Sequence, residues 1–179
     1  MGTGLVVCGL NGAGKSTLGK ALADRLSFYF IDSENLYFSE TDSDYIYDSP
    51  RTHEEAEKLL FYKTQTHKNF VFASVKGDYG EAANPYFQYV VLIDVPKNIR
   101  LQRVKNRSFQ IFGNRILPNG DLYEREKKFL DFVKSRDNNT VEEWVRSLTC
   151  PVIRVDGTKP VNENVDIIIE KILSFTPFC

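Results

Sequence analysis

Residues 9–16 read Gly-Leu-Asn-Gly-Ala-Gly-Lys-Ser, which matches the phosphate-binding pattern G-x-x-x-x-G-K-[ST] at every fixed position. Glycine lets the backbone pass close to phosphate oxygens, because no Cβ blocks the approach. The N–H groups of such a loop point inward as an anion nest, and the following helix adds its free N-terminal N–H groups. The sequence therefore predicts a phosphate-binding loop, in which Lys15 reaches the phosphates and the Ser16 hydroxyl is a ligand of Mg²⁺.

The residues around this loop provide the context that the motif requires. Leu5-Val6-Val7-Cys8 is a short apolar run, typical of a buried parallel strand. Leu18, Leu22 and Leu26 then recur at helical spacing. A strand, a glycine-rich loop and a helix thus follow in order, which disfavours a chance glycine-rich turn. The residues predicted to bind the nucleotide here are Gly9, Asn11, Gly12, Ala13, Gly14, Lys15, Ser16 and Thr17.

The composition favours one globular domain over residues 1–179, with a substantial core. Its 23 basic and 24 acidic residues nearly cancel, so there is no electrostatic argument for general nucleic-acid binding. No apolar run has the length of a membrane span, and no signal peptide is recognisable. The three cysteines lack metal-ligand spacing. We expect a cytoplasmic protein, a monomer or homodimer, without a membrane partner.

Apolar strand-like runs alternate with helical patterns along the chain. This alternation predicts an α/β, three-layer fold, with helices on both faces of a five-stranded parallel sheet. Two sequences of the capping-box type, Thr52–Glu55 and Thr140–Glu143, predict helix starts. Two polar, turn-rich insertions stand out at about 39–51 and 108–121. The predicted strands lie near residues 5–8, 28–31, 70–75, 89–94 and 152–155.

The segment after the fourth predicted strand helps to sort the chain among nucleotide-binding classes. The chain has no base-reading N-K-x-D, which a GTPase would carry, and it is too short for a large motor ATPase. Asp94 ends an apolar strand and is either a Mg²⁺ ligand or a turn residue. Pro96 opens a helix with Arg100, Arg103 and Arg107 on one face. Such arginines bind phosphates and bases or form a solvated basic face.

This helix resembles the lid entry of adenylate kinases and related small P-loop kinases. Arg103 and Arg107 match the R-x-x-x-R spacing of those families. The resemblance implies that the two arginines flank the nucleotide, one stacking on adenine and one contacting phosphate. Residues 108–121, which include Arg115, resemble the lid itself. Gly157 and Thr158 follow the fifth strand, in the loop that contacts adenine in this superfamily, although a plain turn has the same composition.

Two carboxylates, Asp32 and Glu34, follow the second predicted strand, and ligands of parallel sheets bind at the carboxyl ends of strands. They resemble the D-x-D of shikimate and gluconate kinases, with Glu in place of the second Asp. The resemblance implies that Asp32 lies near Mg²⁺ and that Glu34 holds an acceptor hydroxyl. An Asp-Ser turn that caps the next helix is the structural alternative, and both interpretations can hold together.

Residues 72–79, FASVKGDY, resemble the C-S-A-L-K-x-x-Y stretch of gluconate kinases. The resemblance implies acceptor contacts there, although Lys76 is equally well explained as a surface lysine. The chain lacks the T-G-D-M-L-R-like stretch of adenylate kinases and the G-G-G of shikimate kinases, so the acceptor is not identified. We expect a substrate-binding insertion within 39–67. The predicted acceptor contacts are Asp32, Glu34, Arg51, Ser74, Lys76 and Tyr79.

These features predict an ATP-dependent phosphotransferase that moves the γ-phosphate of MgATP to a small-molecule acceptor. Ser16 and Asp32 are the predicted Mg²⁺ ligands. The rival hypothesis is a nucleotide-binding switch or slow ATPase that acts through a protein partner. A kinase of nucleic-acid ends is a third hypothesis. The predicted catalytic residues are Lys15, Asp32, Arg107 and Arg115, and the aromatic residues compatible with base stacking or with ordinary packing are Tyr37, Phe38, Tyr45 and Tyr47.

Overall fold

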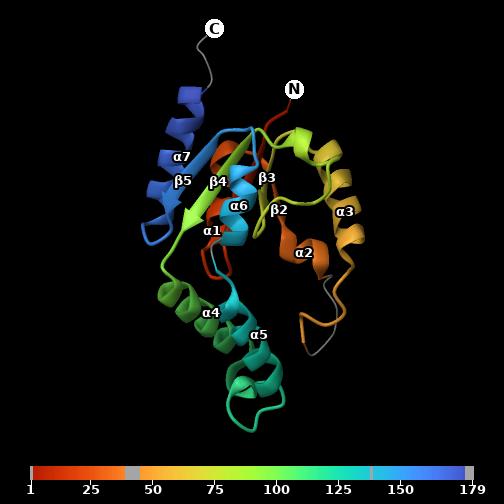
Figure 1. Ribbon diagram of the computed structural model, residues 1–179, viewed down its shortest axis with the longest axis vertical. Coiled ribbons are helices and arrows are strands. Elements are labelled where there is room, and N and C mark those ends of the chain that lie inside the picture. The colour runs from red at the N-terminus through yellow and green to blue at the C-terminus, as the bar shows by residue number, and fades with distance from the viewer. Residues whose placement is uncertain (1, 39–44, 138, 176–179) are drawn as a thin grey trace.

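The computed structural model describes residues 2–38, 45–137 and 139–175, so residues 39–44 of the first predicted insertion lie outside the described part. Five parallel strands form one sheet in the order β2-β3-β1-β4-β5 (Figure 1). This confirms the predicted five-stranded parallel sheet and puts β1 at its centre, between β3 and β4. The strands are β1 (Gly4–Cys8), β2 (Tyr29–Asp32), β3 (Phe70–Ala73), β4 (Tyr89–Asp94) and β5 (Val152–Asp156).

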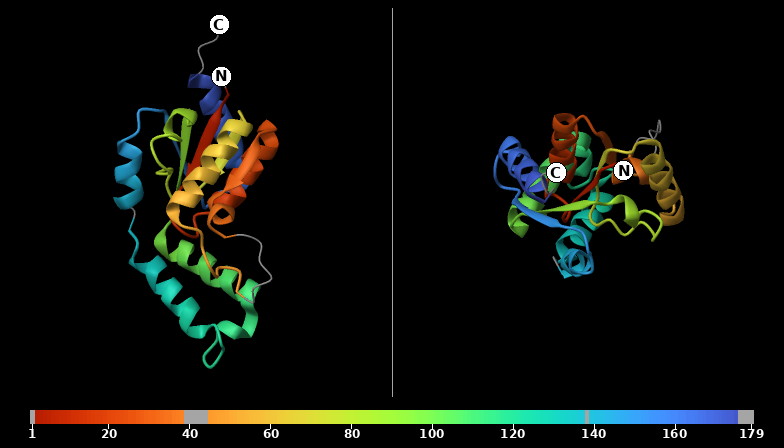
Figure 2. Two further views of the ribbon diagram at one scale, coloured as in Figure 1. Left: turned by 90° about the vertical axis from the view of Figure 1, so that its right-hand side faces the viewer. Right: turned by 90° about the horizontal axis from the view of Figure 1, so that it is seen from above.

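Helices cover both faces of the sheet, as Figure 2 shows from above. One face packs against α1 (Lys15–Leu26) and α7 (Val161–Phe175). The other face packs against α2 (Ser33–Tyr37), α3 (His53–Thr66) and α6 (Asn139–Arg146). None of the helices in the described ranges is long and apolar enough to cross a membrane.

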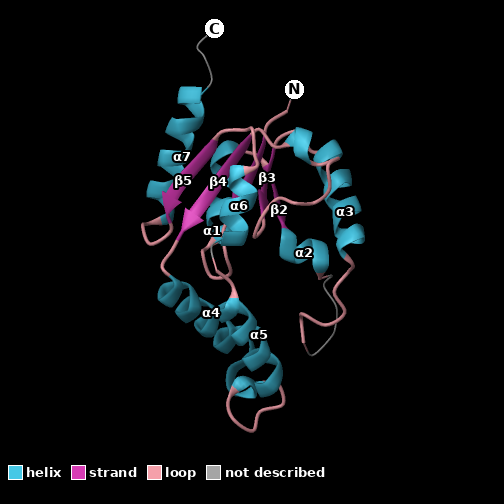
Figure 3. Ribbon diagram, viewed as in Figure 1, coloured by secondary structure: helices cyan, strands magenta, loops and turns pink. Residues whose placement is uncertain are grey.

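A helical hairpin projects beyond the carboxyl ends of the strands (Figure 3). It consists of α4 (Lys97–Phe112), the short 3-10 turn η2 (Gly113–Ile116) and α5 (Tyr123–Ser135). A second 3-10 turn, η1 (Asn84–Tyr86), precedes β4. Because all five strands are parallel, the loops that follow them open toward the side of the sheet where the hairpin lies.

The alternation of side chains along β1 divides the core into two layers. Val6 and Cys8 belong to the layer under α3 and α6, whereas Leu5 and Val7 belong to the layer under α1 and α7. All four side chains are fully buried. A strand that is covered on both faces needs apolar residues at every position, which is why β1 reads as a continuous apolar run.

The insertion predicted at 108–121 begins inside a helix rather than in a turn. Helix α4 continues to Phe112, whose ring is buried and stacks on Tyr45 with a centroid distance of 5.2 Å. This tertiary contact anchors the end of the helix, which the polar local sequence does not indicate. Gly113, at φ 57°, then ends α4 in a conformation that glycine adopts without strain.

The two predicted capping boxes differ in outcome. Thr52 and Glu55 form both reciprocal hydrogen bonds at the start of α3, so that prediction is confirmed. Thr140 instead lies inside α6, which begins at Asn139. The prediction at Thr140 is wrong because the Asp137 carboxylate accepts the Asn139 N–H at 2.9 Å, so the chain turns into the helix earlier than the pattern indicates.

Replacing each of the two threonines by alanine tests this difference. We expect Thr52→Ala to lower the free energy of unfolding by about 1 kcal/mol, because the N-cap hydrogen bond is lost. Thr140→Ala, the matched control, removes an exposed hydroxyl inside a helix and should change the free energy of unfolding by less than about 0.5 kcal/mol. Urea unfolding followed by circular dichroism measures both values. Equal losses in the two variants would contradict the assignment.

Candidate functional site

The main cavity lies where β1, β2 and β3 end, beside the α4–α5 hairpin. It has a volume of about 690 Å³, within the range of small-molecule sites. The loop after β1 and the segments after β2 and β3 line it, and we refer to these two groups of residues as its two ends. The predicted site residues that line this cavity are Asn11, Gly12, Gly14, Lys15, Ser16, Thr17, Asp32, Glu34, Ser74, Lys76, Tyr79, Arg103 and Arg107.

The glycine-rich loop has the backbone conformation of an anion cradle. Gly12 and Gly14 have φ values of +81° and +96°, which side-chain-bearing residues rarely adopt. A Cβ on Gly12 would lie 2.3 Å from the carbonyl oxygen of Arg100, so the loop packs directly on the start of α4. Helix α1 begins at Lys15, and its free N-terminal N–H groups therefore lie next to the loop.

Lys15 extends from the first turn of α1 along the cavity. Its Nζ donates to the carbonyl oxygen of Leu10 at 3.3 Å. Burial lowers the pKa of Lys15 to about 8, and the carboxylate of Asp32 opposes that shift. The amine thus lies in a place where water stabilises its charge poorly, so an anionic ligand would favour the protonated form.

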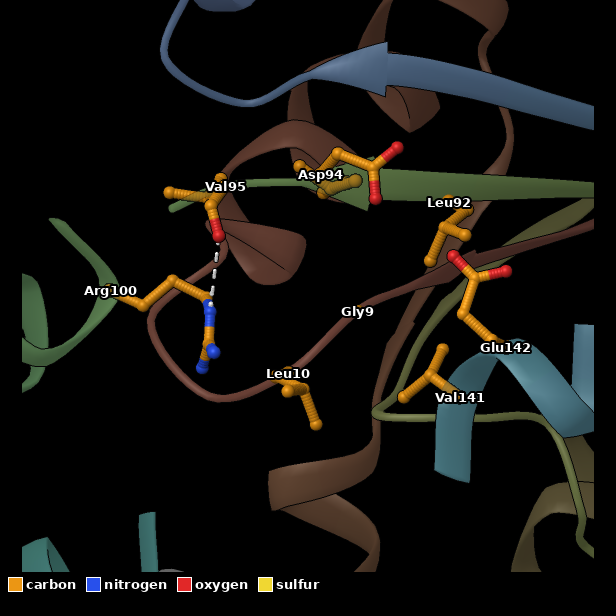
Figure 4. A pocket seen from close by; sticks show the side chains of 9 residues that line it. Gly9, Leu10, Leu92, Asp94, Val95, Arg100, Val141 and Glu142 are labelled. Atoms are coloured by element: carbon orange, nitrogen blue, oxygen red, sulfur yellow. Dashed lines mark hydrogen bonds between the residues drawn. The ribbon is translucent and has the colours of Figure 1, made fainter. Parts of the chain in front are cut away.

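The three arginines on α4 have different surroundings. Arg100 is 3% exposed and lies behind the loop, where it donates to the carbonyl oxygen of Val95 at 3.3 Å (Figure 4). It also donates to the carbonyl oxygen of Asn11 at 3.3 Å. Arg103 donates to the carbonyl oxygen of Gly157 at 2.9 Å, and it also contacts loop carbonyls. Arg100 therefore supports the loop from behind, and Arg103 links the loop to the end of β5.

Arg107 faces the opposite end of the cavity and pairs with Glu34. Its Nη2 lies 2.6 Å from both carboxylate oxygens of Glu34 and 2.8 Å from the hydroxyl of Tyr47. Burial alone would lower the pKa of Arg107, but the hydrogen bonds and charge of Glu34 raise it above its ordinary value. This ion pair connects α4 to α2 beside the cavity, and it engages the carboxylate that the sequence assigns to the acceptor.

Asp32 has a structural contact and also lines the cavity. Its Oδ1 accepts the N–H of Glu34 at 2.9 Å and caps α2, which confirms the helix-cap interpretation. The same carboxylate lies among the lining residues and interacts electrostatically with Lys15. The cap therefore does not remove Asp32 from the site.

The segment after β3 brings its three predicted residues to the cavity. The hydroxyls of Ser74 and Tyr79 lie 3.3 Å apart, and both side chains are buried. Burial raises the pKa of Tyr79 above its ordinary value. Lys76 pairs with Asp78 at 2.6 Å, so its charge is already compensated in this structure.

Several predicted residues do not line the cavity. Arg51 donates to the carbonyl oxygen of Leu36 at 3.0 Å and so contacts the end of α2. Arg115 pairs with Asp121 at 2.6 Å at the far end of the hairpin. The other predicted residues outside the lining are Gly9, Ala13, Gly157 and Thr158.

The loop after β5 is a compact turn. The Thr158 hydroxyl donates to Asp156 at 2.6 Å, which makes the plain-turn interpretation sufficient for that side chain. A Cβ on Gly157 would lie 2.4 Å from Ile93, so this turn packs tightly on the end of β4. Asp94, the alternative Mg²⁺ ligand, pairs with Arg154 at 3.5 Å and lies in a much smaller pocket behind the loop (Figure 4).

Arg136 and His53 are among the cavity residues that sequence reasoning missed. Arg136 donates to the side-chain oxygen of Asn11 at 3.4 Å across 125 positions of sequence. The Nδ1 of His53 forms a hydrogen bond of 2.6 Å with the Tyr37 hydroxyl, and its Nε2 lies 3.1 Å from Glu57. A single arginine after a helix and a histidine at a helix start are unspecific signals, so only the fold reveals them.

The donor set at the cavity fits a Mg²⁺ ion that arrives with a nucleotide. Within the described residues, no group of three or more His, Cys, Asp or Glu side chains could hold a metal ion. Mg²⁺ is usually bound by one or two protein oxygens together with substrate phosphates and water. Ser16 and Asp32, which both line the cavity, offer such oxygens.

Comparison with known proteins agrees with this geometry. The profile of the family described as "AAA domain" matches residues 5–115. The protein YqaC of Bacillus subtilis (strain 168), itself uncharacterised, is 31% identical over 176 residues, covering 94% of this chain and 96% of YqaC.

Solved structures of two kinases share the fold. A gluconokinase from Sinorhizobium meliloti 1021 matches with a TM-score of 0.57 at 17% identity, covering 98% of each chain. A shikimate kinase from Acinetobacter baumannii matches with a TM-score of 0.60 at 18% identity, covering 99% of this chain and 96% of the other. The P-loop kinase fold is therefore shared, and by its sequence this chain belongs to the AAA domain family of nucleotide-binding P-loop proteins.

Proposed function

We propose that this protein is an ATP-dependent phosphotransferase that moves the γ-phosphate of MgATP to a small-molecule acceptor. The observation that carries the proposal is the two-ended cavity. The glycine loop and Lys15 form one end, and the side chains after β2 and β3 form the other. A switch or a simple ATPase needs only the first end. The kinase folds of the structural neighbours support the same conclusion.

The residues at the loop end would hold the nucleotide and offset its charge. The loop and the start of α1 supply N–H groups, and Lys15, Arg103 and Arg136 supply positive charge near the phosphates. Ser16 and Asp32 would hold Mg²⁺, which neutralises phosphate charge when bound. Phosphoryl transfer depends mostly on such positioning and charge stabilisation, so little further chemistry is required of the protein.

At the other end, Asp32 would orient the acceptor hydroxyl and take its proton. Glu34, Ser74 and Tyr79 would bind the rest of the acceptor. Arg107 lies at this end as well, paired with Glu34. Arg115 would reach the phosphates only if the hairpin closed over the cavity, so a lid at 108–121 stays a prediction. We also propose the cytoplasm as the compartment, which fits the free thiols of Cys8 and Cys150.

Transfer of label from γ-labelled ATP to pooled nucleosides, nucleotides, sugars and sugar acids tests this function. We expect at least one pool to take up label in a small organic product. Label that appears only as inorganic phosphate, at a rate no pool changes, would overturn the phosphotransferase and favour the switch or slow ATPase. The Lys15→Ala variant, folded but inactive, serves as the control for contaminating kinases.

Nucleotide affinity should depend on pH through Lys15. Its pKa of about 8 without ligand lies below the ordinary value, and bound phosphates would raise it, so binding takes up a proton above pH 8. We expect the dissociation constant of the ATP complex to be flat below pH 7 and to rise toward about tenfold per pH unit above pH 8. Calorimetric titration measures it. Lys15→Arg keeps the charge at every pH and should lose this dependence; an identical slope in both proteins would contradict the assignment.

Asp32→Asn separates the catalytic from the structural role of this residue. Asparagine caps helices about as well as aspartate, so the free energy of unfolding should change by less than about 0.5 kcal/mol. Turnover should nevertheless fall about a hundredfold or more, because the charge that accepts the proton is lost. Steady-state kinetics and thermal unfolding of one preparation measure both. Unchanged turnover would leave Asp32 as a helix cap only.

A further inference from the structure

The charges around the cavity narrow the chemical class of the acceptor. Of the described residues that line the cavity, five are lysines or arginines. Three of them, Lys15, Arg103 and Arg136, contact the glycine loop and so lie where the nucleotide phosphates would bind. These three cations lie at the loop end of the cavity, where they would pair with the phosphates of the donor nucleotide.

The remaining two cations are already paired with carboxylates. Arg107 lies 2.6 Å from Glu34, and Lys76 lies 2.6 Å from Asp78. Both cations at the acceptor end of the described cavity lining are therefore engaged, and the third carboxylate there, Asp32, interacts with Lys15. An acidic acceptor would have to break one of these ion pairs to reach a cation, which discriminates against it.

The polar groups at this end are chiefly hydrogen-bond acceptors. The carboxylates of Asp32 and Glu34 can only accept hydrogen bonds. His53 is held by two neighbours, because its Nε2 lies 3.1 Å from Glu57 and its Nδ1 lies 2.6 Å from the Tyr37 hydroxyl. This arrangement favours an acceptor molecule with several hydroxyl or amino groups.

Aromatic rings form the adjoining wall of the cavity. Tyr45 donates its hydroxyl to Glu126 at 2.8 Å, and the Tyr47 hydroxyl accepts from Arg107 at 2.8 Å, so their polar ends are engaged within the protein. The rings of Tyr45 and Tyr47 meet edge to face at 5.6 Å, and Phe38 meets Tyr47 edge to face at 5.3 Å. All three residues line the cavity. The Tyr45 ring is already stacked on Phe112 and has the Arg125 guanidinium over it at 4.8 Å, so Phe38 and Tyr47 are the rings of this wall that suit a flat, uncharged ring system.

We propose that the acceptor is a nucleoside, which combines a flat heterocyclic base with uncharged sugar hydroxyls. This inference rests on the proposed phosphotransferase. The base would lie on the aromatic wall, and the sugar would face Asp32, Glu34 and Tyr37. The acceptor hydroxyl oxygen forms a bond to the γ-phosphorus of ATP while the bond to the β,γ-bridging oxygen breaks. ADP leaves, and the hydroxyl proton passes to Asp32.

A matched acceptor panel with the intact protein tests this proposal. MgATP is supplied with purine and pyrimidine nucleosides, their 5′-monophosphates, free ribose and a sugar acid, and product phosphate esters are identified by ³¹P NMR. We expect a nucleoside to give a kcat/KM at least tenfold above its own monophosphate and above ribose or the acid. If a monophosphate, sugar or acid is the preferred acceptor, the nucleoside proposal is wrong but the proposed phosphotransferase activity stands. No ester with any acceptor, despite measurable ATP binding, overturns the phosphotransferase itself.

A charge variant provides the second readout. Glu34→Gln removes the partner of Arg107 and leaves that cation available to an anionic acceptor. We expect the ratio of kcat/KM for the monophosphate over the nucleoside to rise at least tenfold. Glu142→Gln, the matched control, releases Arg154 from a 2.6 Å ion pair away from the main cavity and should leave the ratio unchanged. A ratio that stays constant in Glu34→Gln would show that the ion pair does not select against acidic acceptors.

Discussion

The buried guanidinium of Arg100 is the contact on which the rest of the site depends. Burying an arginine is costly unless its donors are satisfied, and here they bind the carbonyl oxygens of Val95 and Asn11. These two bonds tie the end of β4 to the glycine loop, and Gly12 lets the loop approach the Arg100 backbone closely. The loop is therefore held between β1 and α4, and the position of α4 in turn sets where Arg103 and Arg107 lie.

A second set of contacts joins the hairpin to the segment after residue 44. Arg125 pairs with Asp48 at 2.9 Å, Tyr45 donates to Glu126, and Phe112 stacks on Tyr45. The aromatic wall and the hairpin therefore share their contacts. If the predicted lid closed over the cavity, the hairpin would carry the wall with it. Exposed ion pairs contribute little stability each, and such a link can rearrange at small cost.

A part of the site could be predicted from sequence when the interactions that place it join residues close together in the chain. The loop residues and Asp32 follow apolar strands directly, so strand periodicity and one motif place them. Arg51 and Arg115 were predicted to contact ligands, and in this structure Arg51 donates to the end of α2 and Arg115 pairs with Asp121. Arg136 contacts Asn11 from the distant end of α5, and nothing in the local sequence distinguishes it from a surface arginine.

By itself, the sequence determined the five parallel strands, the glycine loop at residues 9–16 and the start of α3 at Thr52, because burial on both faces, positive φ values and capping act within a few residues. It did not determine that Glu34 would pair with Arg107, that Lys76 would pair with Asp78, or that α4 would continue to Phe112. The Glu34–Arg107 pair and the end of α4 depend on side chains from separate elements that meet only in the folded chain, and the Lys76–Asp78 pair depends on the conformation of the loop after β3. The charge balance of the acceptor end is a sum over such contacts, and only the tertiary structure decides it.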